Sequence, residues 1–346
     1  MSERRTFLDR GIGETRGVVT LDGRPERVIL RRDEEDLRLA LGARLIARVA
    51  TVEPAIGVAF LDLGEGREAM LPFKPDARPV RGGALEVEIR SEAREGKLAT
   101  ARQTGEGDGA PRLLHPPPSV ADILRSIVRD SDPVQGREAR QAADDAEAEA
   151  LEIVHRLPGG GDIAIEPTRA LTSIDVDLGD RKGQDSKRAA RHANLAAIAE
   201  GARLLRLKGL GGLIILDLVG RGHDGAALLA AARLAFAPDN PGVAIGPVGR
   251  FGTMELSIPR RTRPVSDYLL RAGGGLADRA LAQRLVRRIE AEAQTAPGAR
   301  IAATCAPEVA KAAEPLVALL AERYGARFKV SADPSQPRDR FDVAPA

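Results

Sequence analysis

Two short apolar runs that end on acids, joined by a long amphipathic helix, constrain the fold of this chain more than any other feature. The first run, Ala170–Asp177, carries Asp175 and Asp177 at its end, and the second, Leu213–Asp217, ends on its own acid. Side chains two residues apart on a strand point to the same face, and a crossover helix can place two strands side by side. We therefore predict that the three carboxylates meet at one sheet edge and bind Mg²⁺ or Mn²⁺, as in sites that attack phosphodiesters. The alternative is that each Asp is solvated or caps a turn.

Composition limits the other function classes. The net charge of +2 over 346 residues predicts only a local nucleic-acid footprint, and aromatic residues, at 3% with no Trp, leave few platforms for base stacking. The one cysteine, Cys305, excludes internal disulfides and multi-thiolate zinc sites, and we expect it to be a small buried hydrophobe. The first residues lack the apolar core of a secretory signal, and no apolar run is long enough to span a membrane. We therefore expect a cytoplasmic protein.

Pattern and composition divide the chain into five regions. Short alternating β-runs broken by Gly and Pro predict a small barrel, and a Gly/Pro-rich stretch followed by Ala/Glu-rich sequence predicts a linker and helices. The predicted fold class is α/β plus a small β-barrel. The predicted regions are 1–38, N-terminal strands packing with the core; 39–103, the barrel; 104–160, the linker and helical segment; 161–265, the α/β core; and 266–346, a small C-terminal α/β domain.

Basic residues gather in two places. The helix between the two apolar runs has an apolar stripe that includes Leu195 and Ile198, and its other faces are basic. We expect this basic helix to guide phosphates toward the acids, with a solvated flank as the alternative. Its basic residues are Lys187, Arg188, Arg191, Arg203, Arg206 and Lys208. Near the N-terminus a basic flank or solvated face is predicted at Arg24, Arg27, Arg31 and Arg32.

Three motifs, IEPTRALTSIDVD, HANLAAIAEGARLLRLKGLGGLIILDLV and GPVGRFGTMELS, resemble in order and spacing the catalytic core of the ribonuclease E/G family. The resemblance implies a DNase I-like/RNase H-like α/β catalytic core with magnesium at Asp175, Asp177 and Asp217. The family usually has Asn at the second of these positions. Gly220 stands where the family commonly has a further acid.

Within the third motif, Arg250 and Phe251 match the family. A guanidinium binds phosphate oxygens bidentately, so we predict that Arg250 stabilises charge developing on phosphate. An ion pair with Glu255 is the alternative. Phe251, its neighbour, is predicted to contact RNA.

The barrel region resembles the S-one-type OB fold of the same family, through the stretch Ala59–Gly64. The resemblance implies that Phe60 stacks on RNA bases and that Lys97 lies near RNA, whereas Met70 occupies the second aromatic position. Barrel core is the alternative for Phe60. The family's pocket for the five-prime phosphate of RNA has at best a remnant before Asp130, so we expect five-prime sensing to be lost or much reduced.

The C-terminal region is predicted to contain two helices, Leu276–Glu292 and Pro307–Tyr324, each followed by a strand, with a disordered last ten residues. It resembles the small domain that mediates dimer contacts in ribonuclease G-like proteins, so a homodimer is expected. The family's Cys-Pro-x-Cys zinc motif has no counterpart here. We therefore expect no zinc.

The leading hypothesis is a short, ribonuclease G-like, magnesium-dependent endoribonuclease that cleaves single-stranded RNA in RNA processing or decay. The main alternative is an RNA-binding protein with little or no catalysis on the same scaffold. A metal phosphodiesterase acting on small nucleotides would leave the barrel without a role. A metal-free, histidine-paired mechanism would require two of the scattered histidines to meet.

Overall fold

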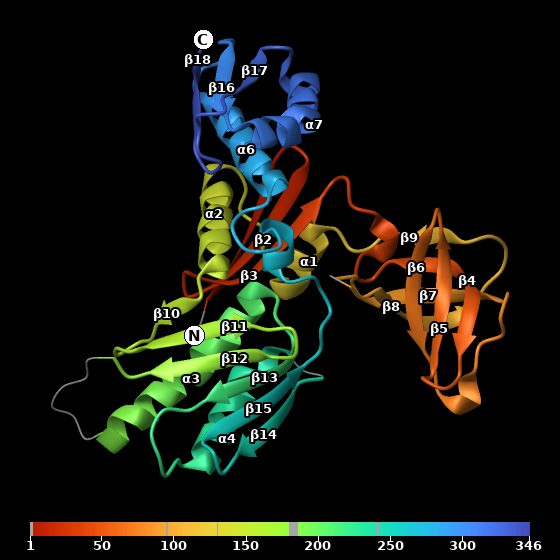
Figure 1. The fold of residues 1–346 in the computed structure, drawn as a ribbon, viewed down its shortest axis with the longest axis vertical. Coiled ribbons are helices and arrows are strands. Elements are labelled where there is room, and N and C mark those ends of the chain that lie inside the picture. The colour runs from red at the N-terminus through yellow and green to blue at the C-terminus, as the bar shows by residue number, and fades with distance from the viewer. Residues whose placement is uncertain (1–2, 95, 130, 180–185, 240–241) are drawn as a thin grey trace.

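The computed structural model describes residues 3–94, 96–129, 131–179, 186–239 and 242–346. A β-barrel projects to one side of an elongated body (Figure 1). The C-terminal elements form one end of this body, a six-stranded sheet forms the other, and the N-terminal strands lie between them. The mixed α/β class predicted from the sequence is confirmed.

The N-terminal strands form an antiparallel sheet that two later helices cover. This sheet comprises β1 (Arg4–Arg10), β2 (Glu14–Leu21) and β3 (Arg24–Arg32). Phe7 and Val18 on one face share a core with α2 (Arg137–Leu151), and Leu8 and Val19 on the other pack with α1 (Val120–Ile127). The helices from the predicted linker region therefore complete a fold with the first strands.

The barrel closes from five strands. They are β4 (Arg44–Glu53), β5 (Val58–Gly64), β6 (Arg67–Pro72), β7 (Ala84–Ser91) and β8 (Ala99–Glu106). The order β5-β6-β8-β7-β4 closes through β4–β5, with β6 and β8 parallel, which is consistent with an OB fold. The sequence prediction missed β9 (Arg112–His115), which pairs with β4 in the stretch expected to be a linker.

The six-stranded sheet has the order β10-β11-β12-β13-β15-β14. Its strands are β10 (Val154–Arg156), β11 (Asp162–Pro167), β12 (Thr172–Asp177), β13 (Gly212–Asp217), β14 (Ala244–Val248) and β15 (Thr253–Ile258). Strands β12 and β13 are parallel because α3 (Ser186–Lys208) crosses over between them, as predicted, and the other neighbours are antiparallel. Helices α3 and α4 (Gly225–Ala235) pack on one face of the sheet. The DNase I-like and RNase H-like assignments stay predictions.

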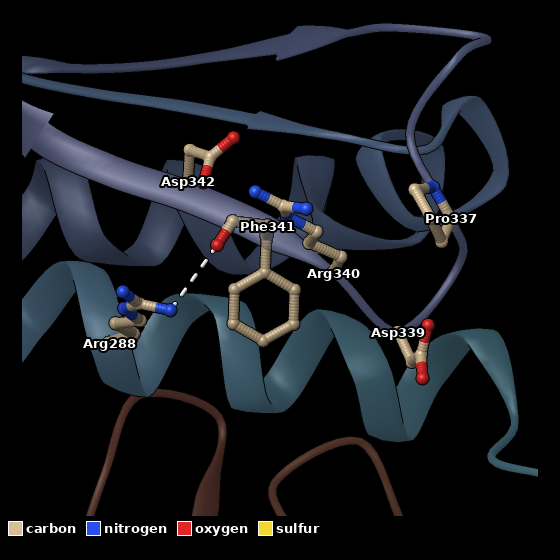
Figure 2. Close-up of a pocket in the computed structure, with 6 residues that line it drawn as sticks. All are labelled: Arg288, Pro337, Asp339, Arg340, Phe341 and Asp342. Atoms are coloured by element: carbon tan, nitrogen blue, oxygen red, sulfur yellow. Dashed lines mark hydrogen bonds between the residues drawn. The ribbon is translucent and has the colours of Figure 1, made fainter.

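The C-terminal end contains α5 (Val265–Leu269), α6 (Asp278–Thr295), β16 (Ile301–Cys305), α7 (Pro307–Tyr324), β17 (Phe328–Ala332) and β18 (Phe341–Pro345). The predicted disorder of the last ten residues is wrong, because β18 pairs antiparallel with β16. Figure 2 shows Phe341 of β18 turned toward α6, where Arg288 donates to its carbonyl oxygen at 3.2 Å. Cys305 is buried, as predicted.

The basic flank or solvated face predicted near the N-terminus lies on β3. Each of its arginines is held by an acceptor from another part of the fold, and the Arg24 side chain is still 48% exposed. Arg24 pairs with Glu200 at 2.6 Å, Arg27 pairs with Asp239 at 3.1 Å, Arg31 donates to the Pro118 carbonyl at 2.8 Å, and Arg32 donates to the Tyr268 carbonyl at 2.7 Å.

A buried ionic network joins the N-terminal sheet to the C-terminal end. Arg16 on β2 is 1% exposed and pairs with Asp9 at 2.6 Å and Glu147 of α2 at 2.8 Å. Arg287 of α6 pairs with Glu14 at 2.7 Å and with the same Glu147 at 3.2 Å. Removing one partner would leave a buried charge uncompensated, so these pairs make the relative placement of the two regions specific.

Candidate active site

Asp175 and Asp217 lie side by side. They are register partners on the parallel strands β12 and β13, so both project from the same face at the same end of the sheet. Both side chains are exposed, and among the described residues neither makes a hydrogen bond or an ion pair. The fold therefore holds two negative charges next to each other, in contact with solvent.

The alternation of each strand explains why the acids face outward. Ile174, Val176 and Leu216 are buried in the core that α3 covers, so the residues between them project from the opposite face. A shift of one residue in either strand would bury an acid and expose an apolar side chain. The hydrophobic pattern therefore fixes the direction of both carboxylates.

Asp177 lies on the same face of β12, two residues beyond Asp175. Its Oδ1 accepts a hydrogen bond from the Gly179 N–H at 2.6 Å. Across the ranges that the structure describes, no group of three or more His, Cys, Asp or Glu residues is arranged to hold a metal ion. The acids thus form a pair rather than a preformed trio, and the role of Asp177 as a ligand stays a prediction.

The turn between β14 and β15 brings Arg250 and Phe251 to the end of the sheet that carries Asp175 and Asp217, which we call the acid edge. Thr253 is the register partner of Asp217, and the Leu218 N–H donates to the Gly252 carbonyl at 3.1 Å. The Arg250 guanidinium lies over the Phe251 ring, 4.5 Å from its centroid, and Phe251 is 79% exposed. Within the described part of the chain, Arg250 makes no ion pair with Glu255.

Asn194 was not among the site residues predicted from the sequence. This residue of α3 is buried, and its amide makes two hydrogen bonds of 3.0 Å, one to the Val219 carbonyl and one from the Val219 N–H. It therefore holds the chain just after Asp217. The available signal was an Asn beside Leu195, within an alanine-rich helix that buries most of its residues.

Gly220 occupies a backbone position that does not accommodate an acidic side chain. Its φ is +93°, and a Cβ built there would lie 2.9 Å from the Ala190 Cβ. An Asp at this position would meet both a strained backbone and a steric clash.

The two halves of the basic helix differ. The first turns of α3 carry three exposed basic residues, Lys187, Arg188 and Arg191. These turns lie at the acid edge, because the helix runs antiparallel to β12 and back to the start of β13. The prediction that the other half guides phosphates is wrong. Arg203 pairs with Glu200 and Glu149, Arg206 pairs with Glu26 and Asp239, and Lys208 donates to the Ala150 and Glu152 carbonyls. Burial lowers the pKa of Lys208 to about 8.

The barrel residues lie apart from the acid pair. Phe60 is half-buried on the outer face of β5, where Met70 of β6 is its register partner, so it does not belong to the barrel core. Lys97 is exposed in the turn before β8. In the same connection, Glu92 accepts from the Arg263 N–H at 3.0 Å. Arg263 follows Ile258, the end of β15 that pairs with Gly212 and is farther from Asp217. The length of β13, roughly 20 Å at about 3.3 Å per residue, therefore separates this connection from the acids.

One hollow lies away from the acids, at the C-terminal end of the molecule. It has a volume of about 550 Å³ and lies between α6 and β18. Figure 2 shows that Arg288, Asp339 and Asp342 around it point in different directions. Nothing in this arrangement converges on one ligand. Asp130, which carried the argument against five-prime sensing, lies outside the described residues, and that loss stays a prediction.

The fold and the site together define an α/β protein with an OB-type barrel and a paired-carboxylate sheet edge. Residues 129–261 match the model of the Ribonuclease E/G family, so the resemblance of the three motifs is confirmed. This segment contains Asp175, Asp217 and the Arg250 turn.

Curated relatives agree with this assignment. Ribonuclease E of Escherichia coli (strain K12) is 39% identical over 108 residues, covering 30% of this chain and 10% of the relative. Ribonuclease E of Haemophilus influenzae is 38% identical over 108 residues, covering 30% of this chain and 12% of the relative. The chloroplastic Ribonuclease E/G-like protein of Arabidopsis thaliana is 32% identical over 119 residues, covering 33% of this chain and 12% of the relative. The chain thus matches only about a tenth of the length of these relatives.

Proposed function

We propose that this protein is a magnesium-dependent endoribonuclease that cleaves single-stranded RNA. One observation carries the proposal: Asp175 and Asp217 are adjacent, exposed and unpartnered among the described residues, within the segment that matches the ribonuclease E/G family. The names of the relatives support an action on RNA.

The donor set fits magnesium. Mg²⁺ is usually bound by one or two carboxylates, together with water and substrate phosphate, so a pair of acids is sufficient. Two like charges on neighbouring strands repel each other, and a cation between them would remove that repulsion. Asp175 and Asp217 would hold the ion, with Asp177 assisting through water. When bound, the ion would neutralise phosphate charge and make an attacking water more acidic. Manganese would suit the same oxygen ligands.

The remaining residues of the edge position RNA. Arg250 donates to a phosphate oxygen, and Phe251 stacks a neighbouring base. Water adds to phosphorus and the bond to the three-prime oxygen breaks, which leaves a five-prime phosphate and a three-prime hydroxyl. Phe60 and Lys97 on the barrel bind the same strand farther away, which favours long substrates over dinucleotides.

Cleavage of a labelled AU-rich oligonucleotide, with and without Mg²⁺, tests the proposal. Asp175→Asn and Asp217→Asn should each lower the cleavage rate by at least about a hundredfold. Glu166→Gln is the matched control, because Glu166 is an exposed acid of the same sheet face outside the pair. Undiminished cleavage by Asp217→Asn would reject the assignment.

RNA binding without cleavage is the second candidate. The lack of a three-ligand group among the described residues, together with Gly220 in place of an acid, favours it. Under this function the wild-type protein shifts labelled RNA in a gel but does not cut it with any divalent ion.

Several finer properties are proposals as well. A role in RNA processing or decay, a cytoplasmic location and a homodimer through the C-terminal domain accompany the proposed activity. Among the described residues, no helix combines the length and apolarity needed to cross a membrane.

A further inference from the structure

We infer that RNA reaches the acid pair from the helix side of the sheet, through a phosphate-binding pocket between α3 and the start of α4. The pocket has a volume of about 310 Å³. Its basic lining consists of Lys187 and Arg191 of α3 with Arg221 and His223 of the loop after β13. The inference rests on the proposed function and names the path of its substrate.

The opposite face of the sheet is unsuitable for phosphates. Acids of four strands project from it, as their register shows: Asp162, Glu166, Asp175, Asp177, Asp217 and Glu255. RNA lying across this face would meet repulsion from these acids, of which Asp162 lies 3.7 Å from the exposed Arg156 side chain. The pocket side of the acid edge carries three cationic side chains, those of Lys187, Arg191 and Arg221. A bound RNA strand therefore lies on that side and exposes only its scissile phosphate to the acid pair.

The pocket is continuous with the Arg250 turn. A Cβ built on Gly252 would lie 3.2 Å from His223 Nε2, so the pocket wall touches the turn that presents Arg250 and Phe251. This Nε2 atom is buried and has no hydrogen-bond partner among the described residues. A phosphodiester in the pocket is therefore next to the one at the acid pair.

The acid that lines the pocket, Asp224, already has two partners. Asp224 caps α4 by accepting from the Ala227 N–H at 3.1 Å, and it lies 3.7 Å from Arg191. Both side chains of that ion pair are more than half exposed, and such pairs contribute little to stability. Arg191 can therefore exchange Asp224 for a phosphate while Asp224 remains the cap.

Charge reversal at Arg221 tests the pocket. Binding of a fluorescent single-stranded oligonucleotide is measured by anisotropy without a catalytic metal, over a series of salt concentrations. Arg221→Glu should weaken binding by about tenfold or more and lower the salt slope by about 0.7, since one phosphate contact is lost. In cleavage assays KM should rise while kcat at saturating RNA stays near the wild-type value. Arg221→Lys should restore most of the affinity.

The matched control is Arg233→Glu, the same charge change at an exposed position near the other end of α4. If Arg221→Glu and Arg233→Glu share the same affinity and salt slope, the pocket does not bind phosphate. Equal urea midpoints for the two variants establish that both are folded. If the wild-type protein binds RNA without cutting it, the proposal of nuclease activity is rejected. The salt dependence of binding by the two variants then still shows whether the pocket binds phosphate.

Discussion

Asn194 holds the residue two positions after Asp217 from both sides. Its Nδ2 donates to the Val219 carbonyl and its Oδ1 accepts from the Val219 N–H, each at 3.0 Å. The side chain is buried in α3, so a rigid helix sets where the strand ends and the pocket loop begins. The end of the sheet that carries the acids thus depends on a residue whose described hydrogen bonds go to Val219 rather than to Asp175 or Asp217.

Replacing Asn194 by Leu removes both hydrogen bonds and leaves the polar groups of Val219 unpaired. We expect the free energy of unfolding to fall by about 2–4 kcal/mol, measured by urea denaturation. His192→Leu on the exposed side of the same helix should change it by less than about 0.5 kcal/mol. Similar unfolding midpoints for the two variants would contradict the role of Asn194.

Asp217→Asn should have opposite effects on activity and stability. Without metal, removing one of two adjacent like charges should raise the free energy of unfolding by about 0.5 kcal/mol. Millimolar Mg²⁺ should raise the Tm of the wild-type protein and should raise that of the variant less, because the ion stabilises only the state that binds it. Equal Tm increases in calorimetry would show that the ion binds elsewhere.

Phe251→Ala should weaken RNA binding without lowering stability. The ring is 79% exposed, so its loss removes a stacking surface rather than core packing. We expect binding to weaken by about 1–3 kcal/mol in anisotropy titrations. Val80→Ala, which truncates another highly exposed apolar side chain, provides the comparison. Equal affinities for the two variants would place Phe251 outside the RNA path.

Gly220→Asp should not restore an acid to the site. Positive φ and the nearby Ala190 Cβ together should lower the free energy of unfolding by about 2–4 kcal/mol. Gly222→Asp is the control, since Gly222 also has positive φ but a Cβ there would meet nothing within 4 Å. Urea denaturation should therefore show the larger loss for Gly220→Asp, and equal losses would remove the steric explanation.

His155 should make the fold sensitive to mild acid. Burial, together with the nearby Lys208, lowers the pKa of His155 from its ordinary value of 6.5. The unfolded chain then takes up the proton first as pH falls, so the stabilisation is present above 6.5 and is lost as pH falls through the folded pKa. His155→Gln should flatten the loss of stability below about pH 6.5, by at most about 1.4 kcal/mol per pH unit. Urea midpoints across this range provide the measurement, and an unchanged pH profile would reject the assignment.

Local pattern was sufficient where neighbouring residues decide the structure. The predicted and observed bounds of α7 are both Pro307–Tyr324, because Pro suits the first helical position and Gly325 follows the last. Local sequence pattern did not predict the structure where a residue distant in the sequence determines it. Phe341 forms a strand because Cys305 and its neighbours offer an open edge, and Arg203 is internal because Glu149 and Glu200 meet it there.

The amino-acid sequence alone determined that two apolar strands end on acids and that a helix connects them, since alternation and amphipathic spacing are local properties. Only the tertiary structure decided that Asp175 faces Asp217 rather than a neighbour one residue away, since the packing of α3 sets that register. It also decided which arginines face solvent at the acid edge. Burial and pairing depend on charges that distant segments bring together, and no local pattern encodes them.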